Sequence, residues 1–170
     1  DFTYSGHLVG GYEKWLGSAT RIKLEAYYQR LWNIPVDEQP SSFSLINQGS
    51  GFTRFFPGEL VNEGTGYNYG LEMTLEKFFS KQFFFLLTGA LFEAKYRGSD
   101  GILRDSDFNG NYAFSALAAY EHAFSKTKSL TMGFNLTYVG GRRTGPVDEA
   151  ASAALNELVF VDDLRNSEPF

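Results

Sequence analysis

Strict alternation of apolar and polar residues along unusually long segments is the feature that most limits how this chain can fold. In residues 67–79, the positions from Tyr67 to Leu75 alternate between apolar side chains and polar residues or glycine. Successive side chains of a β-strand point to opposite faces, so a period of two predicts a strand with one apolar face. The pattern recurs in residues 20–34, 112–124 and 130–141, and less regularly in residues 2–16 and 83–96. We therefore expect an all-β fold with six strands.

The connections between these segments alternate in length. Residues 16–19, 80–82 and 125–128 are short polar turns, whereas residues 35–66, 97–110 and 142 onward are long and rich in Gly, Asn, Asp and Pro. Short turns at one end and long loops at the other are typical of outer-membrane barrels, and a soluble sandwich has no reason to sort its loops this way. We expect an antiparallel up-and-down meander of six strands, part of a large transmembrane β-barrel.

Strand length and aromatic content favour the same architecture. The segments contain twelve to fifteen residues, more than the roughly five or six of soluble strands. At about 3.3 Å per residue and a tilt of about 45°, they would cross an apolar band about 25 Å tall. Aromatic residues make up 17% of the chain and gather near the segment ends, as in interfacial girdles. The negative mean hydropathy is compatible with a barrel, because alternate residues face lipid and lumen.

The phase of the alternation assigns side chains to two faces. The expected apolar face carries Ile22, Leu24, Leu71, Met73, Leu75, Phe134 and Leu136. The opposite face is expected to carry Lys23, Glu72, Thr74 and Asn135, together with Arg21, Glu25, Glu93, Lys95 and Glu121. In a barrel, the first set would contact lipid and the second would line the lumen.

Composition excludes several classes of function. The formal net charge of −5 and the lack of a basic run argue against a nucleic-acid partner. The chain has no cysteine and only His7 and His122, which excludes disulfides, thiolate metal sites and a three-histidine zinc site. The opening residues show no signal peptide, and no run of eighteen apolar residues predicts a helical span.

Several short motifs stand in a fixed order at the starts and ends of the predicted strands. They occupy residues 11–13, 27–31, 34–36, 68–72, 74–77, 96–101, 108–112 and 140–143. The most distinctive read Asn68-Tyr69-Gly70-Leu71-Glu72 and Gly140-Gly141-Arg142-Arg143. In this combination and order, the chain resembles the carboxy-terminal half of the barrel of TonB-dependent outer-membrane receptors, in the form common among Bacteroidetes-type bacteria.

The resemblance implies that residues 1–170 form one partial receptor barrel. The family's barrel has about 22 strands around a plugged lumen, and the six strands here are similar to strands fourteen to nineteen, without the plug domain. The resemblance further implies a transporter in the outer membrane of Gram-negative bacteria that takes up a scarce nutrient of the siderophore, vitamin or oligosaccharide class. It implies no catalytic group and no cofactor.

The same resemblance implies the partners of the chain. The barrel wall would contact outer-membrane lipid and lipopolysaccharide, the plug and the remaining strands of the same protein. A TonB-type energy-coupling complex would act through the plug.

The long loops contain the candidate ligand-binding residues, which combine aromatic area with arginine and acidic groups. They are Phe52, Arg54, Phe55, Phe56, Asp100, Arg142 and Arg143. Aromatic rings and guanidinium groups suit a ligand with a ring or chelate body and anionic edges. The alternative is that the aromatic residues pack onto neighbouring loops and that the arginines hold the loop base.

Three other possibilities remain open from the sequence. Ser5 and His7 lie two apart on one face, which allows an outer-membrane hydrolase, although no oxyanion donor is identifiable. Acidic and Ser residues in loop 97–110 fit either calcium or ordinary turn chemistry, and the spacing does not match a helix-loop-helix calcium site. A surface adhesin or a small complete barrel is the third alternative. Glu72 and Glu76 lie about 13 Å apart, too far for a paired-carboxylate hydrolase site between them, which leaves open a partner carboxylate on another strand.

Overall fold

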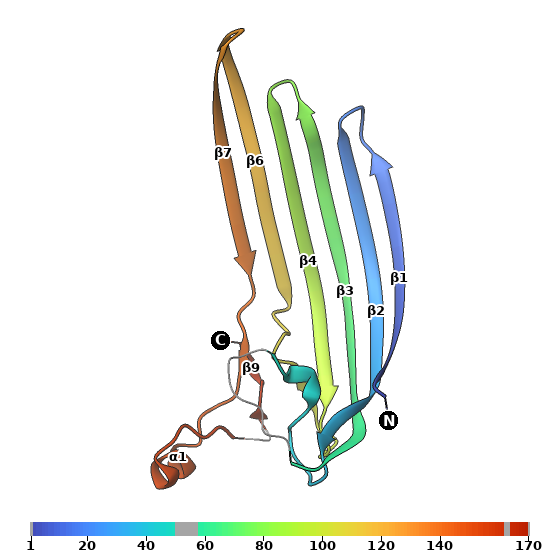
Figure 1. The fold of residues 1–170 in the computed structure, drawn as a ribbon, viewed down its shortest axis with the longest axis vertical. Helices are drawn as coiled ribbons and strands as arrows, with labels where there is room; N and C mark the ends of the chain where they lie inside the picture. The colour runs from blue at the N-terminus through green and yellow to red at the C-terminus, as the bar shows by residue number, and fades with distance from the viewer. Residues whose placement is uncertain (1, 50–57, 162–163, 170) are drawn as a thin grey trace.

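A computed structural model describes residues 2–49, 58–161 and 164–169. Its main element is one antiparallel sheet, seen in Figure 1 as a single curved layer of long strands. The long strands are β1 (Tyr4–Trp15), β2 (Thr20–Asp37), β3 (Leu60–Ser80), β4 (Phe83–Arg97), β6 (Tyr112–Ser125) and β7 (Lys128–Val139), and each pairs with the next. The predicted all-β meander of six strands is confirmed.

The remaining elements lie at the loop end of the sheet (Figure 1). Short strand β5 (Leu103–Asp105) pairs with β4, and a 3-10 helix, η1, covers Leu45–Asn47. Strands β8 (Arg143–Thr144) and β9 (Glu168–Pro169) form a second, two-stranded sheet, and helix α1 spans Glu149–Leu155. The segment from residue 142 onward, expected as a long loop, therefore contains regular elements as well.

The hairpin turns lie at the end of the sheet opposite the long connections (Figure 1). Ser80 and Phe83 are strand partners, so only Lys81 and Gln82 form the β3–β4 turn. Both residues have positive φ, 51° and 70°, as a type I′ turn requires. The sorting of turns and loops that the sequence predicts is confirmed.

Directly opposed residues of neighbouring strands share a face. By this criterion, the strand register confirms that the residues predicted for the apolar face lie on one side of the sheet. Ile22 is paired with Leu75, and Leu24 with Met73. The same face continues across β4 and β6 to β7, where Phe134 and Leu136 lie opposite alanines. We call this side the apolar face, and the side that carries Lys23, Glu72, Thr74 and Asn135 the polar face.

The expected position of Glu93 and Lys95 on the polar face is wrong. Glu93 is paired with Tyr69 and Lys95 with Tyr67, so both share the apolar face. Strand β4 begins with five consecutive apolar residues, which leaves its phase undetermined by sequence alone. At the loop end, Glu93 accepts a hydrogen bond from Asn111 Nδ2 at 2.8 Å, so its carboxylate is compensated there.

Strands β2 and β3 extend beyond their predicted ends. The expected loop of residues 35–66 is correspondingly shorter, because β2 runs to Asp37 and β3 starts at Leu60. The ladder shifts register between Trp32 and Ile34 and again between Ile34 and Val36. These irregularities allow Pro35, which lacks an N–H donor, to lie inside a strand.

Most apolar side chains of the long sheet are exposed, unlike those of an ordinary soluble domain. The buried apolar residues of the described chain are Ile34, Val36 and Tyr96, and all three lie at the loop end. On the apolar face, by contrast, Leu71 is 63% exposed and Phe134 is 58% exposed. The described residues therefore form no core on the long sheet and leave its apolar face uncovered.

Candidate functional site

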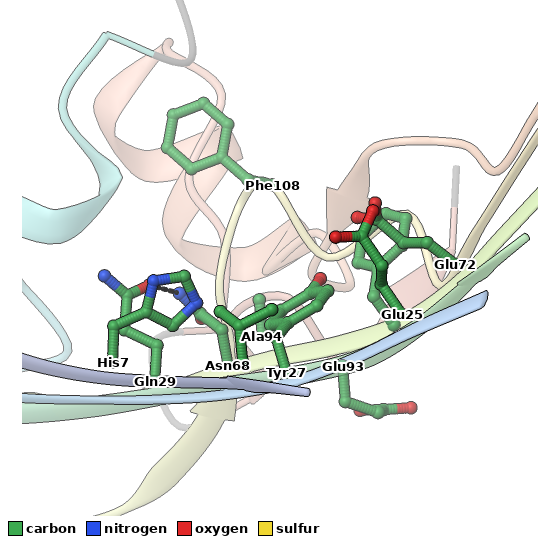
Figure 2. A pocket seen from close by; sticks show the side chains of 11 residues that line it. His7, Glu25, Tyr27, Gln29, Asn68, Glu72, Glu93, Ala94 and Phe108 are labelled. Atoms are coloured by element: carbon green, nitrogen blue, oxygen red, sulfur yellow. Dashed lines mark hydrogen bonds between the residues drawn. The ribbon is translucent and has the colours of Figure 1, made fainter. Parts of the chain in front are cut away.

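A hollow of about 430 Å³ lies on the polar face, near the loop end of strands β1–β4 (Figure 2). Its lining residues are His7, Val9, Glu25, Tyr27, Gln29, Asn68, Glu72, Phe92, Glu93, Ala94 and Phe108. Figure 2 shows the side chains of His7, Gln29 and Asn68 together on one side of the sheet, whereas the Glu93 side chain points to the other side. The hollow is thus a mixed surface of amide, imidazole, carboxylate and aromatic groups.

A row of polar side chains crosses three strands at this hollow. Asn68 Nδ2 on β3 donates to Gln29 Oε1 on β2 at 2.8 Å, and Gln29 Nε2 donates to Ser5 Oγ on β1 at 2.9 Å. His7 is the ladder partner of Gln29 and lies edge-on against Tyr27, with 6.0 Å between ring centroids. Ser5 is therefore hydrogen-bonded to an amide, and the imidazole packs on a phenol ring.

The Tyr27 ring covers a glycine of the neighbouring strand. Gly70 is the ladder partner of Tyr27, and a Cβ added to Gly70 would lie 2.8 Å from Tyr27 Oη and 2.8 Å from the Leu91 carbonyl oxygen. Only glycine leaves room for this arrangement, in which an aromatic ring shields a position that has no side chain. Phe108, from the connection between β5 and β6, projects over the same hollow (Figure 2).

The charged groups of the polar face are concentrated on β1–β3. Arg21 Nη2 binds its ladder partner Glu76 at Oε2, at 2.7 Å, and Lys23 Nζ binds Glu25 Oε2 of the same strand at 2.6 Å. Glu25 is also directly opposite Glu72, and like charges in that arrangement repel. In residues 2–49, 58–161 and 164–169 no group of three or more acidic or histidine side chains is placed to hold a metal ion.

Four predicted ligand-binding residues lie outside the described part of the chain. They are Phe52, Arg54, Phe55 and Phe56. The other three, Asp100, Arg142 and Arg143, lie at the loop end of the sheet but not at the hollow.

Asp100 is part of an internal ion pair. Its carboxylate binds Arg104 Nη2 at 2.6 Å and Nη1 at 2.9 Å, and it accepts the Ile102 N–H at 3.0 Å. Burial opposes ionisation, but the hydrogen bonds from Arg104 and Ile102 outweigh it and lower the pKa of Asp100. The charged form of Asp100 therefore stabilises loop 97–110.

The lowered pKa of Asp100 predicts an acid-sensitive loop. Its stabilisation is complete above the unfolded pKa of about 3.9 and is lost as the pH falls through the lower folded value. Hydrogen exchange around Ile102 should show an acid-induced loss of protection that is absent in Asp100→Asn. At neutral pH that variant should already exchange at least about tenfold faster, since hydrogen bonds to charged groups contribute about 1.5–3 kcal/mol. Identical pH profiles for the two proteins would contradict this assignment.

Arg143 joins the start of the C-terminal segment to the connection before β6. Its Nε donates to the Asn109 carbonyl oxygen at 2.8 Å, its Nη2 donates to Asn111 Oδ1, and its Nη1 lies 3.6 Å from Asp105 Oδ2. The guanidinium therefore holds the loop base, which is the alternative that the sequence left open. Arg142, by contrast, is exposed to solvent.

The long connections also bind one another through polar contacts that the sequence did not predict. Tyr96 Oη donates to the Ser42 carbonyl oxygen at 3.0 Å, and Ser99 Oγ donates to the Gln39 carbonyl oxygen at 2.7 Å. Asn166 Nδ2 donates to Asp107 Oδ1 at 2.6 Å. Residues 38–49, 97–110 and the C-terminal segment are thereby joined. We call them the loop block.

No protein-family model matches the chain, and no curated protein or solved structure shows significant similarity to it. Among the helices that the structure describes, none is long and apolar enough to cross a membrane. The fold and the geometry above therefore carry the functional argument alone.

Proposed function

We propose that this chain forms part of the wall of a TonB-dependent transporter in the outer membrane of Gram-negative bacteria, which takes up a scarce nutrient. The observation that carries the proposal is the exposed apolar face of the long strands, on which the charged residues Arg30, Glu93 and Lys95 lie toward the loop end. Exposing that apolar surface to water costs free energy, whereas contact with lipid hydrocarbon does not. The polar face then lines the lumen.

The sheet edges support a larger closed structure. Strands β1 and β7 stand at the two ends of the strand order, and each pairs with one neighbour. All twelve residues of each strand are exposed. Unpaired backbone groups are not tolerated in hydrocarbon, so further strands must continue the sheet on both sides.

The polar face is suited to contact with a plug that fills the lumen. Glu25 and Glu72 oppose each other, and Lys23 compensates only the first of them among the ion pairs of the described residues. A cationic group on the plug would relieve this repulsion. The amide row of Asn68 and Gln29 offers further hydrogen-bonding groups beside it.

The proposal implies that the loop end of the sheet faces the cell exterior and that the hairpin turns face the periplasm. Epitope insertion tests this orientation in intact cells. A short tag placed after Gly101, in the loop between β4 and β5, should bind antibody at the cell surface. The matched tag between Lys126 and Thr127, in the β6–β7 turn, should bind only after the outer membrane is permeabilised. Equal labelling of both sites in intact cells, or recovery of the protein in the soluble fraction, would contradict the proposed location.

Transport needs a separate test, because a barrel wall can serve other functions. Deleting the gene should abolish energy-dependent uptake of one scarce nutrient, and Phe55→Ala with Phe56→Ala should weaken ligand capture while barrel assembly stays intact. Uptake that is unchanged by deletion across siderophores, vitamins and oligosaccharides would favour the adhesin alternative. Nothing in the geometry favours the hydrolase, since Ser5 and His7 have separate partners.

A further inference from the structure

The apolar face carries its own hollow, of about 730 Å³, which extends over β1–β4 to Phe114 of β6. Its floor contains Gly10 and Ala26, which are ladder partners. Larger side chains, among them Tyr12, Leu24 and Met73, stand around it. A Cβ added to Gly10 would meet no atom within 4 Å. The hollow is therefore open space over a floor of small residues, with walls that offer almost only apolar contact.

A cationic side chain lies on the same face, toward the loop end. Arg30 follows Ala26 by four residues on β2, about 13 Å at the usual strand rise, and its ladder partners are Gly6 and Tyr67. It is exposed. Within the described ranges, no hydrogen-bond acceptor or carboxylate partners its guanidinium. Nearby Lys95, in contrast, is paired with Asp105 at 3.3 Å.

Aromatic rings surround Arg30 at the level expected for a membrane interface. Trp32 stacks on Tyr4 with 5.8 Å between centroids, and Tyr67 stacks near Tyr69 at 6.2 Å. Such rings occupy the headgroup region of a bilayer, and guanidinium groups bind phosphate oxygens in a bidentate manner. An apolar hollow below a guanidinium that no described residue partners matches an amphiphile that carries both an acyl chain and a phosphate.

We propose that this surface binds one phosphorylated, acylated glycolipid of the outer leaflet, with an acyl chain in the Gly10–Ala26 hollow and a phosphate on Arg30. This inference rests on the proposed function, because it requires the loop end of the sheet to face the cell exterior. The bound lipid would cover the part of the apolar face that the side chains leave unfilled.

Native mass spectrometry of the whole protein, purified from outer membranes in detergent, tests the site with bisphosphorylated lipid A as the probe. Gly10→Leu fills the hollow, Ala26→Leu fills it from β2, and Arg30→Gln removes the charge. Each should weaken binding at least tenfold. Leu136→Phe adds bulk to the same face on β7, outside the hollow, and should bind as the unaltered protein does. Dephosphorylated lipid A should bind the unaltered protein as weakly as the intact probe binds Arg30→Gln.

Two results would overturn the inference. Unchanged lipid A binding by folded Gly10→Leu, Ala26→Leu and Arg30→Gln would show that the surface has no specific site. Phosphatidylglycerol binding as tight as lipid A binding would show that the site does not select a glycolipid. If the protein still fractionates with the outer membrane, either result leaves the transporter proposal intact. If the protein is absent from the outer-membrane fraction, the proposed function itself is overturned.

Discussion

Replacing Met73 with arginine is expected to destabilise the membrane-embedded protein by about 2–4 kcal/mol, the cost of placing arginine near the bilayer midplane on a barrel. Met73 lies near the middle of β3 on the apolar face and is 43% exposed. Its partners Leu24 and Gly89 offer no countercharge. Urea unfolding in lipid vesicles, followed by tryptophan fluorescence, measures the loss.

The next residue supplies the matched control. Thr74 is on the polar face, with Lys23 and Thr88 as ladder partners. Thr74→Arg introduces the same side chain into the proposed lumen and should change the free energy of unfolding by less than about 1 kcal/mol, because water and polar groups solvate it there. Equal losses for the two variants would contradict the assignment of the apolar face to lipid.

The 170-residue chain expressed by itself is expected not to form a soluble monomer. Its two edge strands, β1 and β7, carry unpaired backbone donors and acceptors along about half of their positions, and the apolar face adds a large exposed surface. Nearly all of the chain should therefore aggregate or require detergent. Size-exclusion chromatography with light scattering gives the mass. A monodisperse monomer that unfolds cooperatively without detergent would contradict the interpretation of this chain as an open-edged segment of a barrel.

The sequence was most informative where only one face of a strand is apolar. In residues 67–79, Leu71 and Met73 alternate with Glu72 and Thr74, and the register confirms every one of these assignments. In β4 the predicted faces were wrong. Both faces are apolar from Phe83 onward, so the alternation does not show which residues share a face. There, pairing with Tyr69 decides where Glu93 points.

The loop block lay beyond sequence reasoning for a different reason. Asn166 donates to Asp107 across 59 positions of the chain, and Tyr96 donates to Ser42 across 54. Composition predicts turns from Asn, Asp and Gly, but it does not predict which distant turn a side chain will reach. The row of polar side chains at the polar hollow could not be predicted for the same reason, since it depends on the registers of β1, β2 and β3 together.

In the proposed outer-membrane location, the lengths of β2 and β3 bear on access from outside the cell. Strand β3 contains 21 residues and its partner β2 contains 18. At about 3.3 Å per residue, β3 spans about 70 Å, or about 50 Å along the membrane normal at a tilt of about 45°. An apolar band about 25 Å tall accounts for only half of that height. In the proposed location, the loop ends of β2 and β3 would therefore stand above the lipid headgroups together with the loop block, which would be the part of this chain within reach of antibodies, phage or incoming cargo.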